Sequence, residues 1–534
     1  MKTFSTFAAA AAIFATANAA VDHIVIKGSK FFYEGNGTQF FMNGVAYQQD
    51  VSTNGTLSGN DEYTDPLADP SVCRRDIPFL VQLRTNTIRV YALDPEKNHD
   101  DCMNQLADAG IYVIADLSQP GQSINRDDAS WTDDLFERYT SVVDMMAKYD
   151  NTLGFFAGNE VSNQANNTVA SAFVKAAVRD TKAYIKRQRY RPLGVGYATN
   201  DDKDIREDLA AYFNCGDPDD AIDFWGYNIY SWCGRSSFQR SGFDVRTREF
   251  ASYSVPVFFA EYGCNEVQPR LFTEVGALYG DEMTDVWSGG IVYMYFQETN
   301  DFGLVEVNNN RVSTLADFDN LSSQMARIDP TGVNMADYNP TNTQPADCPA
   351  VNRGWRAQAT PLPPVANKEL CECMVNSASC VPADDLDEDD YGDLFGTVCG
   401  LEDGICAGIE HNATTGSYGA YSMCNPKQQL AFALNAYFQS QNRRQDACDF
   451  RGQAKTQRSS DASGNCERLM DQAGEDGTGT VTSAPTGTGA AAGSATSSGA
   501  AVGAVTVPRM ETGLMQLGLY VVVAMFSGAG MLLL

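Results

Sequence analysis

The chain is 534 residues long, with 43% hydrophobic residues and a formal net charge of −30 from 38 basic and 68 acidic side chains. A sequence of this length can bury a large core and form more than one unit. The acidic excess argues against binding to nucleic acid or to an anionic membrane surface. It fits either an uncharged partner such as a sugar polymer or a role in solubility alone. Fourteen cysteines are typical of proteins that fold in an oxidising compartment.

Residues 1–19 have the pattern of a removed secretory signal peptide. Lys2 gives a positive start, an apolar run follows, and Ala17-Asn18-Ala19 supplies a small-residue cleavage site. A buried structural helix is the alternative, but the segment is short and terminal, which favours the signal peptide.

Strand-like and helix-like segments alternate over residues 20–335. Short apolar runs rich in β-branched and aromatic residues predict buried strands. They lie at 40–48, 85–93, 111–117, 152–160, 191–199, 223–230, 256–263 and 289–296. Amphipathic stretches such as 131–148 and 169–187 predict helices between them. Eight such strands predict an α/β fold of the (β/α)8 TIM barrel type. An open doubly wound sheet is the alternative, and the lack of a glycine-rich turn after the first strand disfavours it.

Two glutamates stand at the carboxyl ends of apolar strands. Glu160 closes the fourth predicted strand and Glu261 lies near the end of the seventh. The other strands also end in polar or aromatic residues, namely Gln48, Tyr91, Asp116, Tyr230, Tyr293 and Gln297. In a barrel these ends form the active face. A single strand-end glutamate is often part of a structural salt bridge, but two on one face fit the chemistry of glycosidic bonds.

The chain has only three histidines, and none lies at a predicted strand end. This argues against a Ser-His-Asp hydrolase and against a histidine-ligated metal centre, so we expect no metal and no cofactor. We assign Glu160 as general acid/base and Glu261 as nucleophile. Asn159 is placed to bond a sugar 2-hydroxyl, and Tyr230 and Tyr293 to steady the nucleophile or stack on sugar rings.

The remainder of the chain divides by composition. Residues 336–370 are rich in Pro, Asn, Thr and Ala and predict a linker. Residues 371–470 hold eight cysteines, an even number that predicts a small disulfide-rich domain. The spacing Cys371-Glu372-Cys373 is too tight for a usual zinc pair. The acidic run 384–390 is read as a solvated loop in preference to a calcium site, because it lacks the EF-hand spacing.

The C-terminal region has the composition of a membrane-anchoring signal. Residues 471–500 predict a flexible Ser/Thr/Gly/Ala-rich stalk, and 501–534 a GPI-attachment propeptide with an apolar tail. A single-pass membrane helix is the alternative. No Lys or Arg follows the apolar run, which favours the GPI anchor.

Several of these motifs together resemble a known family. Gly158-Asn159-Glu160, Ala260-Glu261-Tyr262-Gly263, Arg89-Val90-Tyr91 and the cysteines at 73, 102, 215, 233 and 264 look like fungal GPI-anchored β-1,3-glucanosyltransferases of glycoside hydrolase family 72. The cysteine-rich unit resembles the family-43 carbohydrate-binding module found in one branch of that family. The resemblance implies a retaining enzyme that cleaves an internal β-1,3-glucan linkage and transfers the new reducing end to the non-reducing end of another glucan.

The same resemblance implies the substrate-binding residues and three disulfides. With Asp116 and Tyr230, which are expected at the site from their strand-end positions, the predicted substrate-binding residues are Tyr91, Asp116, Ser118, Gln119, Pro120, Gly121, Gln122, Ser123, Ile124, Asn125, Arg126, Asn159, Asp201, Arg206, Tyr230 and Tyr293. Of these, Tyr91, Asn159 and Tyr293 would contact the donor, the loop 118–126 would line the cleft, and Asp201 and Arg206 would contact the acceptor. The implied disulfides are Cys73–Cys102, Cys215–Cys348 and Cys233–Cys264.

Two other functions remain open at this point. An ordinary β-1,3-glucan hydrolase would use the same two glutamates, because only the group that reaches the intermediate differs. An inactive glucan-binding wall protein is the third possibility. The expected location is the outer face of the plasma membrane and the cell wall, through the GPI anchor.

Overall fold

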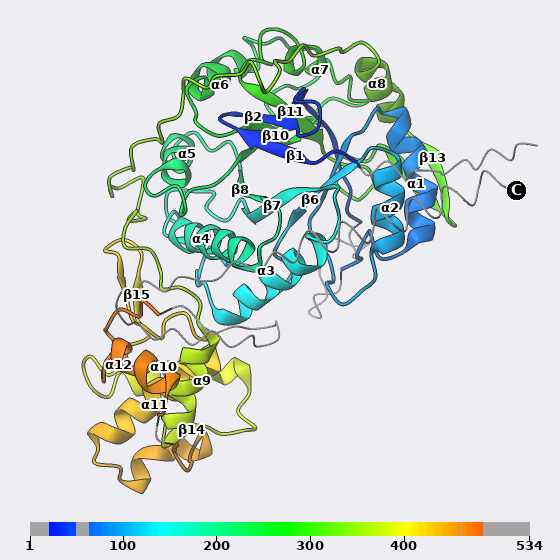
Figure 1. Cartoon of the computed structure of the whole chain (residues 1–534). Coiled ribbons are helices and arrows are strands. Elements are labelled where there is room, and N and C mark those ends of the chain that lie inside the picture. Colours follow the sequence, from blue (N-terminus) through cyan, green and yellow to red (C-terminus); the bar gives the residue numbers. More distant parts are fainter. Residues whose placement is uncertain (1–20, 50–62, 461, 484–534) are drawn as a thin grey trace, which may run out of the picture. The chain divides into compact units, whose positions relative to one another are not determined.

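The computed structural model describes residues 21–49, 63–460 and 462–483 (Figure 1). The predicted signal peptide, the predicted propeptide and residues 484–500 of the predicted stalk lie outside these ranges. Within the described ranges, no helix is both long enough and apolar enough to cross a membrane.

Eight parallel strands close into a barrel, which confirms the predicted TIM-barrel fold and excludes the open sheet. The strands are β4 (Met42–Ala46), β5 (Thr87–Val90), β6 (Tyr112–Asp116), β7 (Thr152–Asn159), β8 (Gly194–Thr199), β9 (Trp225–Ile229), β10 (Val257–Tyr262) and β11 (Trp287–Val292). Each pairs with the next in sequence, and β11 closes the barrel against β4. Seven of the eight predicted strand segments contain one of these strands whole, and the eighth, 289–296, overlaps β11 but begins two residues after the start of that strand.

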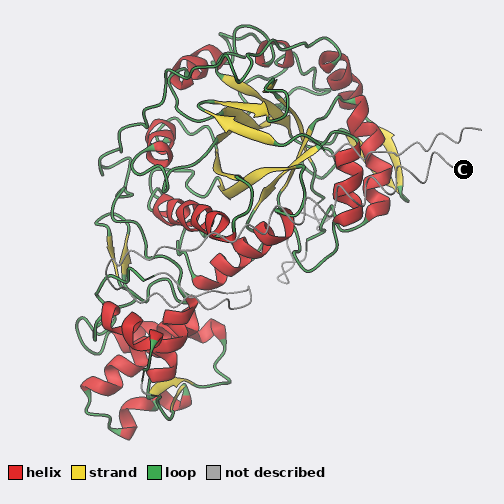
Figure 2. Cartoon of the chain, in the orientation of Figure 1, coloured by secondary structure: helices red, strands yellow, loops and turns green. Residues whose placement is uncertain are grey.

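Helices surround the barrel strands (Figure 2). They are α1 (Pro70–Gln82), α2 (Asp100–Asp108), α3 (Asp133–Met146), α4 (Ala170–Gln188), α5 (Arg206–Asn214), α6 (Phe243–Phe250), α7 (Val275–Leu278) and α8 (Ala316–Met325). The helices α3 and α4 fall within one residue or two of the predicted amphipathic stretches. The start of α3 is set by Thr132, whose side chain accepts a hydrogen bond from the Leu135 amide.

The barrel strands pack apolar side chains on both faces. Trp225 and Tyr227 of β9 belong to the large cluster shared with the helices, whereas Phe156 and Phe258 belong to a separate cluster inside the barrel. A three-stranded N-terminal sheet, which the sequence did not predict, adds to this inner cluster. It consists of β1 (Ile24–Lys27), β2 (Lys30–Tyr33) and β3 (Gln39–Phe40).

The N-terminal sheet covers the amino ends of the barrel strands. The ring of Phe31 lies 6.2 Å from that of Phe224, the residue just before β9, and 6.1 Å from that of Phe258 near the start of β10. The carboxyl ends of the strands therefore remain available for a site.

Register irregularities precede both predicted catalytic glutamates. The pairing of β7 with β8 shifts between Phe156 and Asn159, and the pairing of β10 with β9 shifts between Phe259 and Glu261. Such bulges interrupt the strict alternation of side chains and re-aim the residue that follows.

Residues beyond α8 pack on the barrel before the cysteine-rich region begins. Trp355, within the predicted linker, is fully buried in the outer barrel cluster, where its ring lies 4.9 Å from that of Tyr212. A disulfide between Cys215 and Cys348 ties the same segment to the end of α5. A hairpin of β12 (Val305–Asn308) and β13 (Arg311–Thr314) lies between β11 and α8 in sequence.

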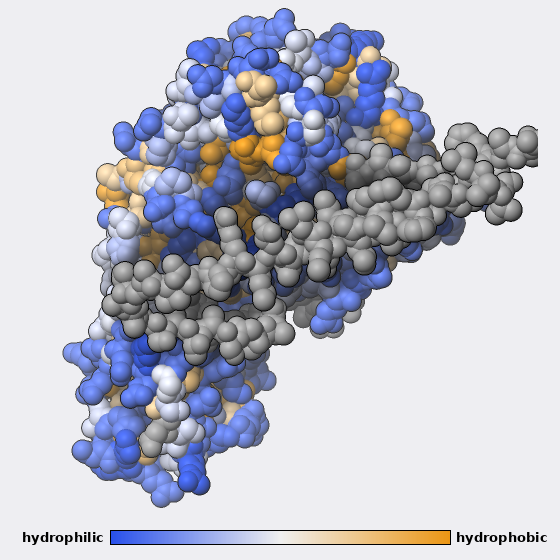
Figure 3. Space-filling view, in the orientation of Figure 1, coloured by the Kyte–Doolittle hydropathy of each residue, from blue (hydrophilic) through white to orange (hydrophobic). Residues whose placement is uncertain are grey.

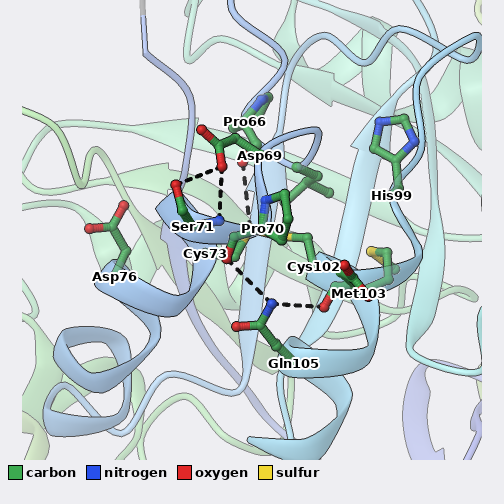
Figure 4. The surroundings of a disulfide bond; sticks show 12 residues. Pro66, Asp69, Pro70, Ser71, Cys73, Asp76, His99, Cys102, Met103 and Gln105 are labelled. Atoms are coloured by element: carbon green, nitrogen blue, oxygen red, sulfur yellow. Dashed lines mark hydrogen bonds between the residues drawn. A yellow bond between two sulfur atoms is a disulfide. The ribbon is translucent and has the colours of Figure 1, made fainter. Parts of the chain in front are cut away.

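Two further disulfides lie in the barrel. Cys73 of α1 bonds Cys102 of α2 (Figure 4), and Cys233 bonds Cys264 just beyond β10. In Figure 4 the Gln105 amide of α2 also donates to the Pro70 carbonyl at the start of α1. With Cys215–Cys348, these are the three pairs that the family resemblance implies.

The cysteine-rich region is small and mainly helical. Its elements are α9 (Lys368–Ser377), β14 (Cys380–Pro382), α10 (Tyr391–Cys399), β15 (His411–Asn412), β16 (Ser417–Tyr418), α11 (Pro426–Ser440), β17 (Ala454–Thr456) and α12 (Asn465–Ala473). Its eight cysteines form Cys371–Cys424, Cys373–Cys466, Cys380–Cys448 and Cys399–Cys406. This confirms a disulfide-rich domain. Figure 3 shows one face of the whole molecule. Where this face is coloured, it is largely hydrophilic, with scattered apolar patches.

Candidate active site

Glu160 directly follows β7 in an unusual backbone conformation. Its φ angle is 50°, in the left-handed region that side-chain-bearing residues rarely adopt. Two hydrogen bonds hold this backbone. The Glu160 amide donates to the Ala198 carbonyl of β8 over 2.8 Å, and its carbonyl accepts from Arg126 Nη2 over 2.7 Å. Strained residues that neighbours hold in this way are common in active sites.

Glu261 is buried in β10, with 8% of its surface exposed. Its Oε1 accepts from the Tyr91 hydroxyl over 2.9 Å, and its Oε2 accepts from the Tyr230 hydroxyl over 2.8 Å. Burial raises the pKa of Glu261 above the usual range. The nearby Arg89 guanidinium opposes this rise, and the negative charge of Glu160 adds to it.

Arg89 of β5 joins two carboxylates beneath the site. It is fully buried, and its guanidinium donates to both oxygens of Asp116 over 3.0 Å and to Glu261 Oε1 over 3.3 Å. The guanidinium also lies 4.3 Å from the centre of the Tyr91 ring. This buried cation compensates the charge of Glu261 and restrains its position.

Asn228 of β9 contacts the other glutamate. Its Nδ2 donates to Glu160 Oε1 over 2.8 Å and to Asn159 Oδ1 over 3.1 Å. In the register of β9 and β10, Asn228 is also the Cα partner of Glu261. Hence Asn228 lies beside Glu261 in the sheet and bonds the Glu160 carboxylate.

A cavity of about 740 Å³ opens at this end of the barrel. Its lining includes Asn159 and Val161, the residues on either side of Glu160. It also includes Tyr63, the strand-end side chains Gln48, Tyr91 and Asp116, and most of the predicted cleft loop, namely Ser118, Gln119, Pro120, Gly121, Ser123, Ile124, Asn125 and Arg126. Gln122 borders a different cavity, and Asp116 has both oxygens engaged by Arg89. The cavity is large enough for several sugar units.

Of the remaining predicted substrate-binding residues, some lie beside the two glutamates and some do not. The Tyr293 ring lies edge-on to that of Tyr91, at 6.4 Å, so it belongs to the same site. Asp201 and Arg206 form an ion pair at 2.7 Å, and Tyr227 also donates to Asp201. The ion pairs and hydrogen bonds described for these two residues do not reach Glu160 or Glu261, and Arg206 borders a separate cavity of about 850 Å³.

The sequence did not indicate Asn228 or the role of Arg89. Both lie inside otherwise apolar strand runs, at 223–230 and 85–93. A polar residue at an inward position near a strand end was the signal that could have identified them. Within the described residues, the one cluster with metal-ligand spacing is Cys233, Cys264 and Glu266, whose two sulfurs are bonded to each other.

Comparison with known proteins identifies the family. Residues 13–329 match the model of the glucanosyltransferase family, which is more than half of the chain. The chain belongs to the glucanosyltransferase family. Residues 378–455 of this family member match the X8 domain, within the cysteine-rich region. This confirms the resemblance to family-72 enzymes with a C-terminal carbohydrate-binding module, and the chain is a transglycosylase of the glycoside hydrolase type.

Similar proteins match nearly the whole glucanosyltransferase. A 1,3-β-glucanosyltransferase of Arthroderma benhamiae is 56% identical, over 99% of this chain and all of that protein. The 1,3-β-glucanosyltransferase gas1 of Schizosaccharomyces pombe is 48% identical, over 89% of this chain and 86% of that protein. A solved structure of a mutant of Saccharomyces cerevisiae Gas2p, in complex with laminaritetraose and laminaripentaose, is 43% identical. Its TM-score is 0.75, and the match covers 82% of this chain and 95% of that chain.

Proposed function

We propose that Glu261 and Glu160 carry out a retaining double displacement on β-1,3-glucan. Glu261 attacks the anomeric carbon of an internal linkage while Glu160 protonates the leaving sugar oxygen. The non-reducing-end hydroxyl of a second glucan then attacks the glycosyl-enzyme and gives its proton to Glu160. The product is an elongated glucan with a new β-1,3 bond.

The contrast between the two carboxylates supports this division of roles. Glu261 receives donors on both oxygens from Tyr91, Tyr230 and Arg89, which suits an ionised nucleophile. Glu160 is more exposed, and Asn228 contacts only its Oε1. A carboxyl group with one unengaged oxygen next to the cavity suits proton exchange with a sugar oxygen. The laminari-oligosaccharides bound by the yeast relative support β-1,3-glucan as the substrate.

Substitution of each glutamate tests the proposal. With reduced β-1,3-gluco-oligosaccharides, the unmodified chain should produce longer oligosaccharides without a net increase in reducing ends. Glu160→Gln and Glu261→Gln should each lower product formation by several orders of magnitude. Glu306→Gln, an exposed residue of β12, is the matched control and should leave the product profile unchanged. Rising reducing ends would instead indicate a hydrolase, and unaltered products in both glutamate variants an inactive barrel.

We also propose that the domain at residues 371–470 binds glucan. Most of its aromatic side chains fill its own core, among them Tyr421, Phe432 and Phe438. Phe395 and Tyr437 are only partly buried, so they are the candidates for stacking on sugar rings. In the full chain, Phe395→Ala and Tyr437→Ala should each reduce retention on insoluble β-1,3-glucan, whereas unchanged retention in both variants would contradict the proposal.

The proposed location is the outer face of the plasma membrane and the cell wall, through a GPI anchor attached near residue 500. The Gly/Ser/Thr/Ala-rich sequence and the apolar tail support it. Cells that express the full chain should release it after treatment with a phosphatidylinositol-specific phospholipase C. Retention after complete digestion of a known GPI-anchored control protein would favour a membrane-spanning tail.

A further inference from the structure

The Asn228 side chain is buried and has one unused hydrogen-bonding atom. Only 2% of the residue is exposed, and its Nδ2 makes the two contacts to Glu160 and Asn159. Its Oδ1 is buried without a hydrogen-bond partner among the described residues. An unpaired buried acceptor costs free energy, which an apolar residue at the same position would avoid. An amide at this position therefore destabilises the barrel core. We infer that the benefit of Asn228 comes from the contacts of its NH2 group.

The amide distinguishes the two oxygens of Glu160. Oε1 accepts from Asn228, whereas Oε2 has no partner within the described part of the chain. No described Lys, Arg or His forms an ion pair with this carboxylate, and Arg126 contacts only its main-chain oxygen. Glu160 extends from a backbone with φ 50°, so its side chain enters the site from a position fixed by Ala198 and Arg126. The rotation of the carboxylate about its own axis then depends on Asn228.

We propose that Asn228 is a positioning residue that orients Glu160 Oε2 toward the reacting sugar oxygen in both half-reactions. The inference rests on the proposed role of Glu160 as acid/base. In the first step the proton on Oε2 passes to the leaving oxygen as the bond from Glu261 to the anomeric carbon forms. In the second step the acceptor oxygen attacks that carbon, the bond to Glu261 breaks, and the acceptor proton returns to Oε2. Asn228 itself neither gains nor loses a proton.

The same amide also sets the position of Asn159. Because Asn159 Oδ1 accepts from Asn228, the Asn159 Nδ2 is oriented away from this bond, and Asn159 lines the cavity. Asn228 thus couples the acid/base to the residue expected to bond the donor sugar. Because hydrogen bonds to the sugar 2-hydroxyl strengthen in the transition state, a loss of Asn228 should lower kcat more than it raises KM.

Azide rescue tests the proposal. With a β-laminari-oligosaccharyl fluoride as donor, the first step needs no acid because fluoride leaves without a proton. The second step with a sugar acceptor still needs Glu160 as base, whereas azide attacks the glycosyl-enzyme without giving up a proton. Asn228→Ala should therefore transfer to sugar about 10- to 100-fold more slowly than the unmodified chain, and added azide should restore turnover and yield the glycosyl azide.

The controls separate this role from simple stability. Asn151→Ala removes another buried amide, which bonds the Met103 and Ile111 carbonyls away from the site, and azide should not accelerate it. Asn228→Asp keeps the volume of the side chain but places an acceptor against Glu160, so it should also be slow and rescued by azide. If both Asn228 variants are slow and azide accelerates neither, the residue is only structural and the proposal is overturned. Transfer by either variant at the unmodified rate overturns it as well.

Glu160→Gln, assayed in parallel, distinguishes a failure of the positioning role of Asn228 from a failure of the proposed function. Rescue of Glu160→Gln by azide, without rescue of the Asn228 variants, contradicts the positioning role alone. An active Glu160→Gln that azide does not affect contradicts the proposed function itself.

Discussion

Arg89 Nη1 lies 3.3 Å from Glu261 Oε1 at a position where the arginine has no exposure to solvent. The same guanidinium bonds both oxygens of Asp116. One buried cation therefore pairs with two buried carboxylates. Removing it would leave two negative charges without compensation in a medium that solvates them poorly.

Replacement of Arg89 should be strongly destabilising. Arg89→Met keeps a long side chain but removes the charge, and we expect the free energy of unfolding to fall by about 3–5 kcal/mol. Arg89→Lys keeps the charge but cannot bond Asp116 through two nitrogens, so its effect should be intermediate. Urea denaturation measures both. Arg248→Met, which removes an exposed guanidinium that pairs with Asp244 within one helix, is the control and should change stability by less than about 1 kcal/mol.

The acidic limb of the pH profile should respond to Tyr230. Its hydroxyl donates to Glu261 Oε2, which favours the ionised form of Glu261 and opposes the burial that raises the pKa of this residue. Tyr230→Phe removes the donor, so the pKa of Glu261 rises further and the acidic limb of kcat/KM moves to higher pH. Tyr212→Phe removes a hydroxyl that bonds Gln358 and should leave the limb in place. A limb that stays fixed in Tyr230→Phe would show that another group governs it.

Asp133 should make stability depend on pH. Burial raises the pKa of Asp133 to about 7, and the Asp134 charge adds to this, while Asp133 Oδ2 has no partner among the described residues. A folded-state pKa above the unfolded value means that the folded chain binds the proton more tightly. Stability from this group is present at low pH and is lost as pH rises toward 7.

Asp133→Asn should therefore stabilise the protein at pH 8 by about 1–3 kcal/mol and have little effect near pH 4. Unfolding curves at both pH values measure the difference. Asp128→Asn, at an exposed position in the loop before α3, is the control. Equal effects of Asp133→Asn at the two pH values would contradict the assignment.

Trp355 should contribute to the stability of the barrel although it lies outside the predicted barrel range. Its side chain is fully buried, packs against Tyr212, and donates through Nε1 to the Ala357 carbonyl. Trp355→Ala should cost about 3–5 kcal/mol by leaving a large cavity. Val365→Ala, at a position 45% exposed, should cost much less. If denaturation showed similar small losses for both variants, residues 336–370 would behave as a linker.

The sequence predicted those strands and helices whose buried side chains form a regular pattern within one short segment. The apolar runs at 152–160 and 256–263 became β7 and β10 nearly residue for residue, because a strand buried on both faces needs continuous apolar side chains. The N-terminal sheet was missed because its strands have four, four and two residues, too short for a periodic signal. Trp355 lay in a Pro- and Asn-rich segment, whose composition resembles a loop even where one side chain is buried.

The amino-acid sequence alone was enough to predict the barrel, the disulfide-rich domain and the two strand-end glutamates. These predictions depend on the period of hydrophobic residues, the number of cysteines and the order of the strands, which can all be seen without the tertiary structure. The contacts that set the charge environment and the orientation of each glutamate depend on the tertiary structure. Asn228 meets Glu160 from 68 residues away, and Arg89 meets Glu261 from 172 residues away. Which side chains converge at one rim depends on barrel closure, on the bulges in β7 and β10, and on the exclusion of water around them. Those properties belong to the packed structure and leave no pattern in any single segment.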